Sequence, residues 1–585
     1  MGILAWVAVG AGAAFAVLPA VKPPKIAWVP LLALVGLALW TLAAMGWTES
    51  QERTFNEFGR IVSYLGVVVL IMFGVGKNTW RLVAAGLLTA AVFVCGMTLL
   101  SRLWPSAFPV DTVAQNFGTT RISYPFGYWN AVGCWSAMTI TLCLAYAAHA
   151  RSWLVRALAL AVVPMCACGL YLALSRAGIG GAVVGAVAVV FFAQYRWLTF
   201  LQTLAAGAVS VGVVLWLRKQ TGLVEATSTD AAWSLVGLLV VAGAVLGAVA
   251  MAGWQFDLGR KLTMSKRVGR PLGWGVVGLA VLALVGAGFV WGGEAWGQFS
   301  ETKFAAEEAT TDARLAQLNG NRKNVWESSI SAWEKMPVEG IGPGTFEFWW
   351  SRNGTNSEFV RDTHSVYLEA LAETGLVGFG LVLVMFLFPL GAAAFWRASK
   401  APEARWIGIH GGLIAVFAVF AFQAGFDWMW ESTAVAASAL VSITVAAAAS
   451  STQRPRAQAS VSIAFLAVAL ATGLMLSVAL ASARSLSSSA SEFASGDLDA
   501  ALVDASTAVD TLPWSASAHA QRGLILIEQG KLGEAKSFVR EAQRLEPTNW
   551  RWPLLLARTS VEQGEAGSAS REFARYQDLR GHRLR

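Results

Sequence analysis

A histidine and a set of arginines are the residues of this chain whose types and spacing could do chemistry. His364 follows Asp362 and Thr363, either of which can cap a helix that would end at Gly375. A helix start offers free N–H groups and a partial positive charge, which suit a phosphate and favour a neutral imidazole. Because a neutral imidazole can take a proton from an incoming hydroxyl, His364 is a candidate general base. The alternative is a capping or surface histidine without a catalytic role.

Three arginines form the second candidate group: Arg121, Arg176 and Arg322. Guanidinium groups bind phosphate oxygens bidentately and keep their charge, so arginines that converge at a membrane surface fit a diphosphate. Each arginine alone could instead be an anchor that reaches the lipid headgroups from a helix end. All three fall on the predicted external side, where the positive-inside bias disfavours idle arginines.

The elements that must position these residues are membrane helices. Of the 585 residues, 56% are hydrophobic and 14% are charged, which is too apolar for an ordinary soluble domain of this length. A spanning helix needs about twenty mostly apolar residues, and the sequence predicts an all-α fold, a polytopic bundle of about fourteen transmembrane helices. The expected spans are residues 3–20, 27–46, 60–76, 82–100, 130–149, 153–173, 178–194, 198–216, 232–253, 272–292, 376–395, 406–425, 432–450 and 459–481.

The orientation of the bundle follows from its Lys and Arg residues, which collect in alternate loops, as expected of cytoplasmic loops. These loops are residues 22–25, 77–81, 151–156, 196, 260–270, 397–405 and 454–456. Residues 49–57, 101–129 and 293–375 are predicted to be external, with both termini. The basic residues form no single patch, so membrane lipids are expected as partners and nucleic acid is not, with loop 260–270 against anionic lipid.

The long external loop, residues 293–375, is predicted to be ordered. Apolar residues recur at helical spacing over residues 325–333 and again over residues 366–372. A Gly/Pro turn at residues 340–346 separates the two predicted amphipathic helices.

The chain changes character after Ala483, where it becomes polar, Ala-rich and periodic. This predicts a membrane domain at 1–482 and a separate external domain at 483–585. Three Gly-Ala pairs recur every 34 residues: Gly496 with Ala501, Gly530 with Ala535, and Gly564 with Ala569. The spacing resembles tetratricopeptide repeats, in which helix pairs stack. A spacer or assembly role and a docking surface for a protein partner are both open.

Three motifs stand in order along the chain: SRAG at 175–178, GIGPGTF at 340–346 behind Arg322 and Trp326, and HSVYLEALAETG at 364–375. This series resembles the bacterial O-antigen ligase and O-antigen polymerase superfamily, chiefly over residues 121–387. The resemblance implies a GT-C type glycosyltransferase of the bacterial plasma membrane, which moves a glycan from undecaprenyl diphosphate to an acceptor hydroxyl at the external face. It implies an inverted linkage and neither a cofactor nor a metal.

The same resemblance implies roles for single residues. His364 would be the catalytic base or an acceptor-side residue, Arg176 and Arg322 would hold the diphosphate, and Arg121 is a further candidate. Family members often carry Asn-Pro-Asn after the first of these arginines, whereas only Asn130 remains here. Asn130, Trp349, Trp350 and Glu369 are candidate contacts to the transferred glycan or to the acceptor, which would be a glycan, a lipid or a protein. The 27 tryptophans also fit interfacial belts, so Trp349 and Trp350 have a structural alternative to stacking on sugars.

Two other classes of protein fit parts of the pattern. A transporter of polysaccharide or lipid would also have many spans, but the predicted spans hold few ionisable residues at mid-depth, and Asp427 is placed at a helix end. A non-catalytic scaffold could recruit proteins through the repeats, and it should tolerate His364→Ala. The five cysteines lie in apolar stretches, which indicates neither disulfides nor a metal site.

Overall fold

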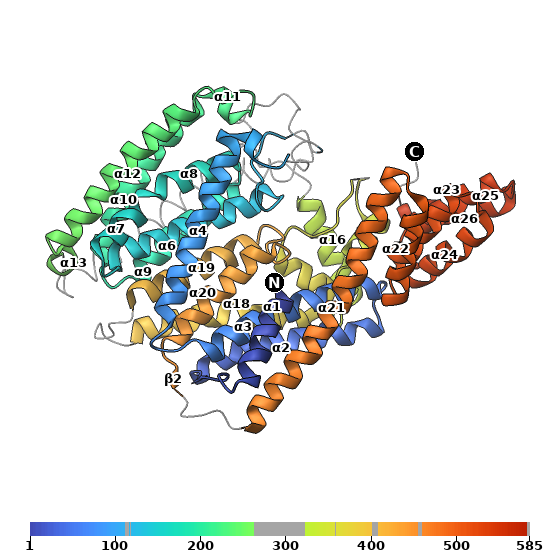
Figure 1. The fold of residues 1–585 in the computed structure, drawn as a ribbon, viewed down its shortest axis with the longest axis horizontal. Helices are drawn as coiled ribbons and strands as arrows, with labels where there is room; N and C mark the ends of the chain where they lie inside the picture. The colour runs from blue at the N-terminus through green and yellow to red at the C-terminus, as the bar shows by residue number, and fades with distance from the viewer. Residues whose placement is uncertain are drawn as a thin grey trace. The chain divides into compact units, whose positions relative to one another are not determined.

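The computed structural model describes residues 1–110, 116, 119–262, 322–356, 358–399, 407–453 and 459–581. The chain divides into two compact units (Figure 1). Unit 1 consists of Met1–Gly76, Asn324–Phe388 and Ser450–Arg585, and unit 2 consists of Lys77–Lys323 and Pro389–Ala449. Each unit is described separately below.

Unit 2 is a bundle around α6, Trp129–His149, whose apolar stretch is 94% buried. α6 packs against α4, α8, α9 and α19, so it is the element to which the others are fixed. The helices of this unit are α4 (Trp80–Leu103), η3 (Pro105–Ala107), α6, α7 (Trp153–Ala161), α8 (Val163–Leu172), α9 (Arg176–Phe192), α10 (Arg196–Arg218), α11 (Thr221–Val224), α12 (Ala232–Gln255), α13 (Leu258–Lys261), α19 (Ile407–Ala424) and α20 (Thr433–Ala448).

Unit 1 combines membrane helices, the described part of the long loop and the C-terminal helices. Its two-residue strands β1 (Val21–Lys22) and β2 (Thr452–Gln453) pair antiparallel. Its helices are α1 (Gly2–Ala14), η1 (Lys25–Ala27), α2 (Trp28–Ala43), η2 (Ala44–Gly46), α3 (Gln51–Gly74), α16 (Arg322–Lys335, from its third residue), α17 (Phe346–Asn353), α18 (Val366–Ser399, up to Phe388), α21 (Ala459–Ser495), α22 (Leu498–Thr511), α23 (Ala516–Glu528), α24 (Leu532–Leu545), α25 (Arg551–Glu562) and α26 (Ala566–Arg580).

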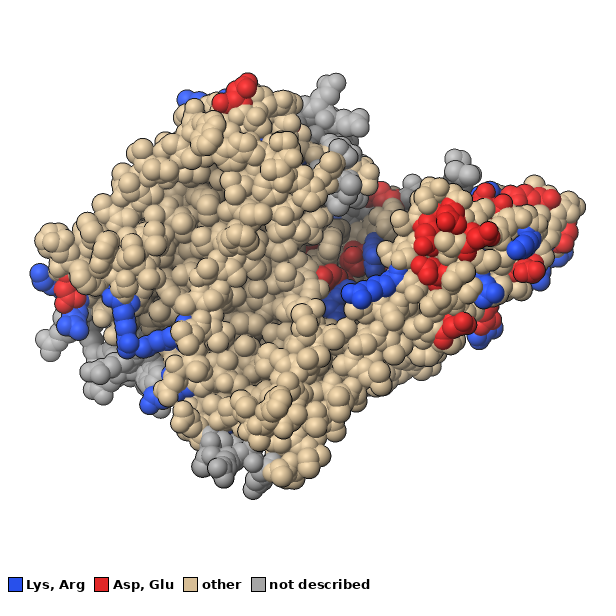
Figure 2. All heavy atoms as spheres, in the orientation of Figure 1, with Lys and Arg blue, Asp and Glu red and all other residues tan. Residues whose placement is uncertain are grey.

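Each predicted span that falls among the described residues corresponds to helix, although the first is shorter than predicted, because α1 ends at Ala14 and not at residue 20. Nine described helices are long and apolar enough to cross a membrane, and four shorter apolar helices correspond to the remaining predicted spans: Gly2–Ala14, Arg176–Phe192, Gly408–Ala424 and Thr433–Ala448. The predicted span 272–292 lies outside the described residues. On the face drawn in Figure 2, charged side chains gather on the C-terminal helices and at helix ends, while broad surfaces over the membrane helices carry none. The chain is therefore an all-α, multi-pass membrane protein.

The long loop contains both predicted helices and one that was not predicted. Residues 325–333 lie in α16 and residues 366–372 in the first part of α18, whereas α17 is the additional helix. Gly375 has φ 63° and interrupts α18 between this first part and the apolar remainder. A Cβ at Gly375 would lie 2.2 Å from the Val338 carbonyl oxygen, so glycine is needed for both backbone shape and space. The predicted end of the loop helix at Gly375 is thus present as a break.

The C-terminal helices repeat one turn three times. Gly496, Gly530 and Gly564 have φ of 87°, 75° and 75°, with open space around each Cβ position, so they serve the left-handed turn alone. Each is followed by a residue whose N–H donates to the carbonyl five residues back, the bond that closes a helix end in a left-handed cap. The paired alanines Ala501, Ala535 and Ala569 are buried between helices. The predicted boundary at residue 483 falls inside α21, which runs unbroken from the membrane segment into these helices.

Candidate functional site

The SRAG motif places Arg176 through a close contact between two helices of unit 2. Ser175 caps α9, because its hydroxyl accepts the N–H of Gly178 at 3.1 Å. A Cβ at Gly178 would lie 3.0 Å from the Cα of Gly133 in α6. The two glycines therefore let α9 approach α6, and Arg176 is the first residue of α9.

Arg121 is bound by backbone carbonyls of the segment that precedes α9. Its Nε donates to the carbonyl of Ala173 at 3.0 Å, and its Nη2 donates to the carbonyl of Leu174 at 2.6 Å. The guanidinium lies over the Trp129 ring, 4.7 Å from the centroid. These contacts leave Arg121 fixed beside the start of α9 rather than free in a loop.

Asp427 is the residue that joins this cluster, and sequence reasoning did not select it as a site residue. It lies between α19 and α20 with 1% of its surface exposed. Its carboxylate accepts hydrogen bonds from Tyr128 Oη and Asn130 Nδ2, and it pairs with Arg322 Nη2 at 3.3 Å. Asn130 also accepts from Arg121 Nη2 at 3.4 Å. The available signal was an acidic residue between Phe426 and Trp428 at the end of an apolar helix.

The three arginines affect one another electrostatically. Burial, together with the charges of Arg176 and Arg322, lowers the pKa of Arg121 to about 10, against the opposing effects of Tyr128 and Asp427. Arg121 still carries its proton at neutral pH. Burial and the charge of Asp427 raise the pKa of Tyr128 well above its usual range, so its hydroxyl remains a donor. Trp428 covers the Tyr128 ring, with centroids 4.0 Å apart.

His364 lies in unit 1, in the turn that precedes α18. The prediction that Asp362 or Thr363 caps the helix is wrong, because Ser365 is the residue before α18 and its hydroxyl accepts the N–H of Leu368 at 3.4 Å. His364 therefore stands before the cap, half-buried, with a left-handed backbone at φ 54°. Residues other than glycine adopt this conformation at a cost, and histidine is among the more tolerant.

The turn around His364 is fixed by its neighbours. Thr363 Oγ1 donates to the carbonyl of Ser365 at 2.8 Å, and the N–H of Thr363 donates to the Glu369 carboxylate at 3.3 Å. Trp326 of α16 donates to the carbonyl of Thr363 at 3.1 Å. Glu369 thus holds the turn, a structural contact beside its predicted role towards the glycan or acceptor.

Asp362 adds a second titratable group beside His364. Burial raises the pKa of its carboxyl, Arg361 opposes the shift, Glu57 adds to it, and His364 opposes it. Asp362 was absent from the predicted site residues.

Glu373 explains the glycine-rich motif at residues 340–346. Its carboxylate accepts the N–H of Gly344 at 2.7 Å and the N–H of Phe346 at 2.9 Å. Gly340 has φ 73°, and a Cβ there would lie 2.4 Å from the backbone of Glu373. The glycines let the turn wrap around one buried carboxylate, which attaches α17 to the first part of α18.

Trp349 and Trp350 lie in the core that this turn builds. They are 7% and 1% exposed, and they pack with Val325, Phe346 and Ala372. Trp349 donates to the Ser328 carbonyl at 3.1 Å and Trp350 to the Glu358 carbonyl at 2.8 Å. Both rings are therefore packed in the core of the loop.

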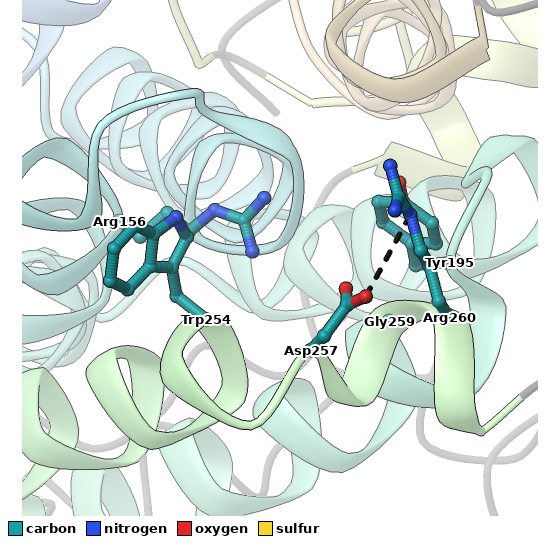
Figure 3. Close-up of a pocket in the computed structure, with 6 residues that line it drawn as sticks. All are labelled: Arg156, Tyr195, Trp254, Asp257, Gly259 and Arg260. Carbon is teal, nitrogen blue, oxygen red and sulfur yellow. Dashed lines mark ion pairs between the residues drawn. The ribbon is translucent and has the colours of Figure 1, made fainter.

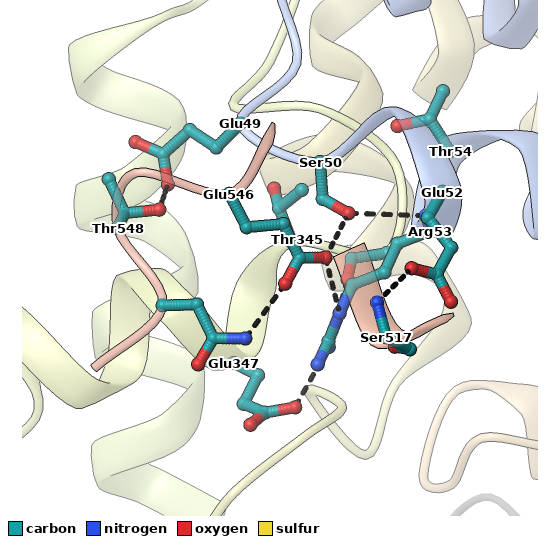
Figure 4. A network of polar contacts seen from close by, with 12 residues as sticks. Glu49, Ser50, Glu52, Arg53, Thr54, Thr345, Glu347, Ser517, Glu546 and Thr548 are labelled. Carbon is teal, nitrogen blue, oxygen red and sulfur yellow. Dashed lines mark hydrogen bonds and ion pairs between the residues drawn. The ribbon is translucent and has the colours of Figure 1, made fainter. Parts of the chain in front are cut away.

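The C-terminal helices dock onto the start of α3 and onto α17 through a network of buried charges (Figure 4). Both oxygens of Glu347, which is 2% exposed, are paired, with Arg53 Nη1 at 2.8 Å and with Arg551 Nη2 at 2.6 Å. Glu546 accepts from Ser50 Oγ at 2.5 Å, and Glu52 accepts the N–H of Ser517 at 2.9 Å. Part of the C-terminal domain, for which the sequence allowed a docking surface for a protein partner, therefore forms an interface within the chain itself.

The structure thus gathers the predicted residues into two groups. Arg121, Arg176, Arg322 and Asn130 lie in unit 2, where Asp427 binds Asn130 and pairs with Arg322, and the charges of Arg176 and Arg322 act on Arg121. His364, Glu369, Trp349 and Trp350 lie in unit 1.

A comparison with curated proteins finds no match to this chain. A family model does match, over less than half of the chain, and the matched segment contains Arg322 and His364 but not Arg121, Arg176 or Asp427. The match supports a role in cell-surface polysaccharide assembly. Residues 226–383 are similar to the family described as O-antigen ligase (Wzy_C).

Proposed function

We propose that this protein is a membrane glycosyltransferase, which moves a glycan from an undecaprenyl-diphosphate carrier to an acceptor hydroxyl at the external membrane face. The match to the O-antigen ligase family over residues 226–383 supports the reaction class. The acceptor is a hydroxyl of a glycan, a lipid or a protein.

The observation that carries the proposal is the charge balance of the cluster in unit 2. Three guanidinium groups influence one another there, and Asp427 is the carboxylate among them. Two positive charges therefore remain uncompensated within this set of four residues. A diphosphate that links a lipid to a sugar carries two negative charges, and guanidinium groups match its oxygens in number and geometry. Asp427 pairs with Arg322, and it accepts a hydrogen bond from Asn130, which in turn accepts one from Arg121.

The reaction follows from these roles. The acceptor oxygen forms a bond to the anomeric carbon of the glycan, while the bond from that carbon to the diphosphate oxygen breaks. The proton of the acceptor hydroxyl passes to His364, and the electron pair leaves with the diphosphate, whose growing charge the arginines stabilise. Attack opposite the leaving group inverts the linkage and releases undecaprenyl diphosphate. The step needs no metal ion to balance it.

The conformation of His364 supports its place in the proposal. A non-glycine residue at φ 54° costs free energy, and here Ser365, Thr363 and Glu369 hold the turn in that shape. A histidine that only covered the surface would gain nothing from this constraint. The strained turn presents a half-buried imidazole at a fixed position, as a general base requires.

Transfer of lipid-linked glycan in isolated membranes tests the proposal. Wild type, Arg176→Ala and His364→Ala are compared at equal expression, without added divalent metal, and Lys219→Ala serves as an exposed control. Loss of transfer in the first two variants and normal transfer in the control is the expected result. Normal transfer in all variants would remove these residues from the mechanism and favour a transporter or a scaffold.

A further inference from the structure

Unit 2 contains a polar cavity of about 280 Å³ that the proposed reaction does not use (Figure 3). It is lined by six residues from α7, α12 and α13 and from the turn before α10: Arg156, Tyr195, Trp254, Asp257, Gly259 and Arg260. These side chains include two guanidinium groups, one carboxylate and two aromatic rings.

The Tyr195 ring, which forms one wall of the cavity, is fixed by contacts with His149 and Gly259. The ring lies parallel to that of His149, at 5.4 Å between centroids, and the Tyr195 N–H donates to His149 Nε2 at 3.2 Å. On the other side, a Cβ at Gly259 would come within 3.0 Å of the Tyr195 ring. The absence of a side chain at Gly259 therefore lets the ring pack directly on the backbone of α13.

The charged groups occupy opposite sides of one carboxylate. Arg156 is half-buried, and its Nε is bound to the carbonyl of Ala150 at 2.6 Å, which leaves its Nη groups directed toward the cavity, as Figure 3 shows. Arg260 lies beside Tyr195 and pairs with Asp257 across 3.8 Å. Asp257 stands between the two guanidinium groups, so the site offers both positive and negative charge within one small volume.

The cavity lies where apolar spans end. Arg156 is in the first turn of the candidate span Trp153–Leu172, and Trp254 is in the last turn of the candidate span Ala232–Gln255. Trp254 is 44% exposed, and the same helices expose Leu154, Leu158 and Met251. Aromatic rings and guanidinium groups at this depth meet lipid headgroups, while exposed aliphatic side chains meet acyl chains.

We propose that this cavity binds the headgroup of a zwitterionic phospholipid that carries a primary amine, of the phosphatidylethanolamine class. The phosphodiester lies between Arg156 and Arg260, and the ammonium group is bound by Asp257 beside the Trp254 ring. A purely anionic headgroup would compete with Asp257 for Arg260, with which that carboxylate pairs. An amine-bearing headgroup satisfies all three charges at once. This site is independent of the proposed transferase reaction.

Native mass spectrometry of the purified full chain tests this proposal, with short-chain phosphatidylethanolamine and phosphatidylglycerol as the lipid probes and inorganic phosphate as competitor. Wild type should retain the ethanolamine lipid more strongly. Arg260→Ala should weaken its binding about tenfold, the size expected for one charge-assisted hydrogen bond. Asp257→Asn should reverse the preference in favour of the glycerol lipid. Asparagine keeps the backbone of Asp257, which has φ 47°, because it tolerates the left-handed region.

The control is Arg151→Ala, which removes an exposed charge on the same predicted side but outside the cavity, and its lipid binding should equal that of wild type. Three results would overturn the proposal: equal retention of both lipids by wild type, no response to Arg260→Ala and Asp257→Asn, or full displacement by inorganic phosphate. The last would identify a site for free anions. Both variants change exposed side chains, so gel filtration should show an intact fold.

Discussion

Asp427 organises the candidate donor site at the scale of single residues. Its buried carboxylate is bound by Tyr128 and Asn130 and paired with Arg322. A buried carboxylate of this kind costs desolvation and persists only where its partners satisfy it. Its position therefore fixes where the guanidinium groups stand before any ligand arrives, which is what a preorganised anion site needs.

Asp427→Asn tests this role. The change keeps the shape of the side chain and removes the charge that holds Arg322, so we expect donor turnover to fall at least tenfold and stability to fall by about 1–3 kcal/mol. Turnover at equal folded concentration, together with thermal unfolding, measures the two effects. Asp230→Asn makes the same change at an exposed position of unit 2; it is the comparison and should retain turnover. Full turnover in Asp427→Asn would contradict the role.

At the scale of elements, the C-terminal helices and the loop form one interface. Glu347 of α17 is shared by Arg53 of α3 and Arg551 of α25, and Glu546 is bound by Ser50. Glu373 joins α17 to the first part of α18, whose preceding turn carries His364. The C-terminal helices therefore contact α17, which Glu373 joins to the helix that follows the His364 turn.

Glu347→Gln should loosen the interface. The variant removes the charge that two arginines share, and we expect a loss of about 2 kcal/mol, because Arg551 is partly exposed and part of the interaction is screened. Hydrogen exchange should become faster in α17 and at the start of α25. Glu528→Gln, which breaks an exposed pair with Arg558, should leave exchange unchanged. Equal exchange in both variants would show that the buried Glu347 ion pairs do not hold the C-terminal helices in place.

At the scale of the whole molecule, the charge pattern predicts which side each loop faces. Alkaline phosphatase, which becomes active only outside the cytoplasm, should be active when it is fused after Arg580 and inactive when it is inserted after Lys261. The physical reason is that residues 260–270 hold Lys and Arg without Asp or Glu, whereas acidic residues outnumber basic ones in the predicted external loop 293–375. If only the second fusion were active, the predicted orientation would be wrong, and the arginine cluster would lie on the cytoplasmic side.

The sequence predicts the membrane helices and the repeated turns because both depend on local pattern. Apolar length marks each span, and Gly496, Gly530 and Gly564 mark left-handed turns at a fixed spacing. It does not predict the part played by Asp427, Glu373 or Glu347, because each acquires its role from partners that are distant in the chain. The cap at Ser365 was missed for a smaller reason, since Asp362, Thr363 and Ser365 are all good capping residues within four positions.

The proposed glycan transfer is tested most directly with the purified protein in liposomes, with an undecaprenyl-diphosphate-linked glycan as the only donor and a chelator present. We expect wild type to release undecaprenyl diphosphate in step with acceptor glycosylation. Arg322→Ala and His364→Ala should each reduce both by at least a hundredfold, about 3 kcal/mol of transition-state stabilisation, and Lys219→Ala should reduce neither. Release of undecaprenyl diphosphate at the wild-type rate by Arg322→Ala and His364→Ala, or movement of the intact donor across the bilayer without transfer, would contradict the proposal.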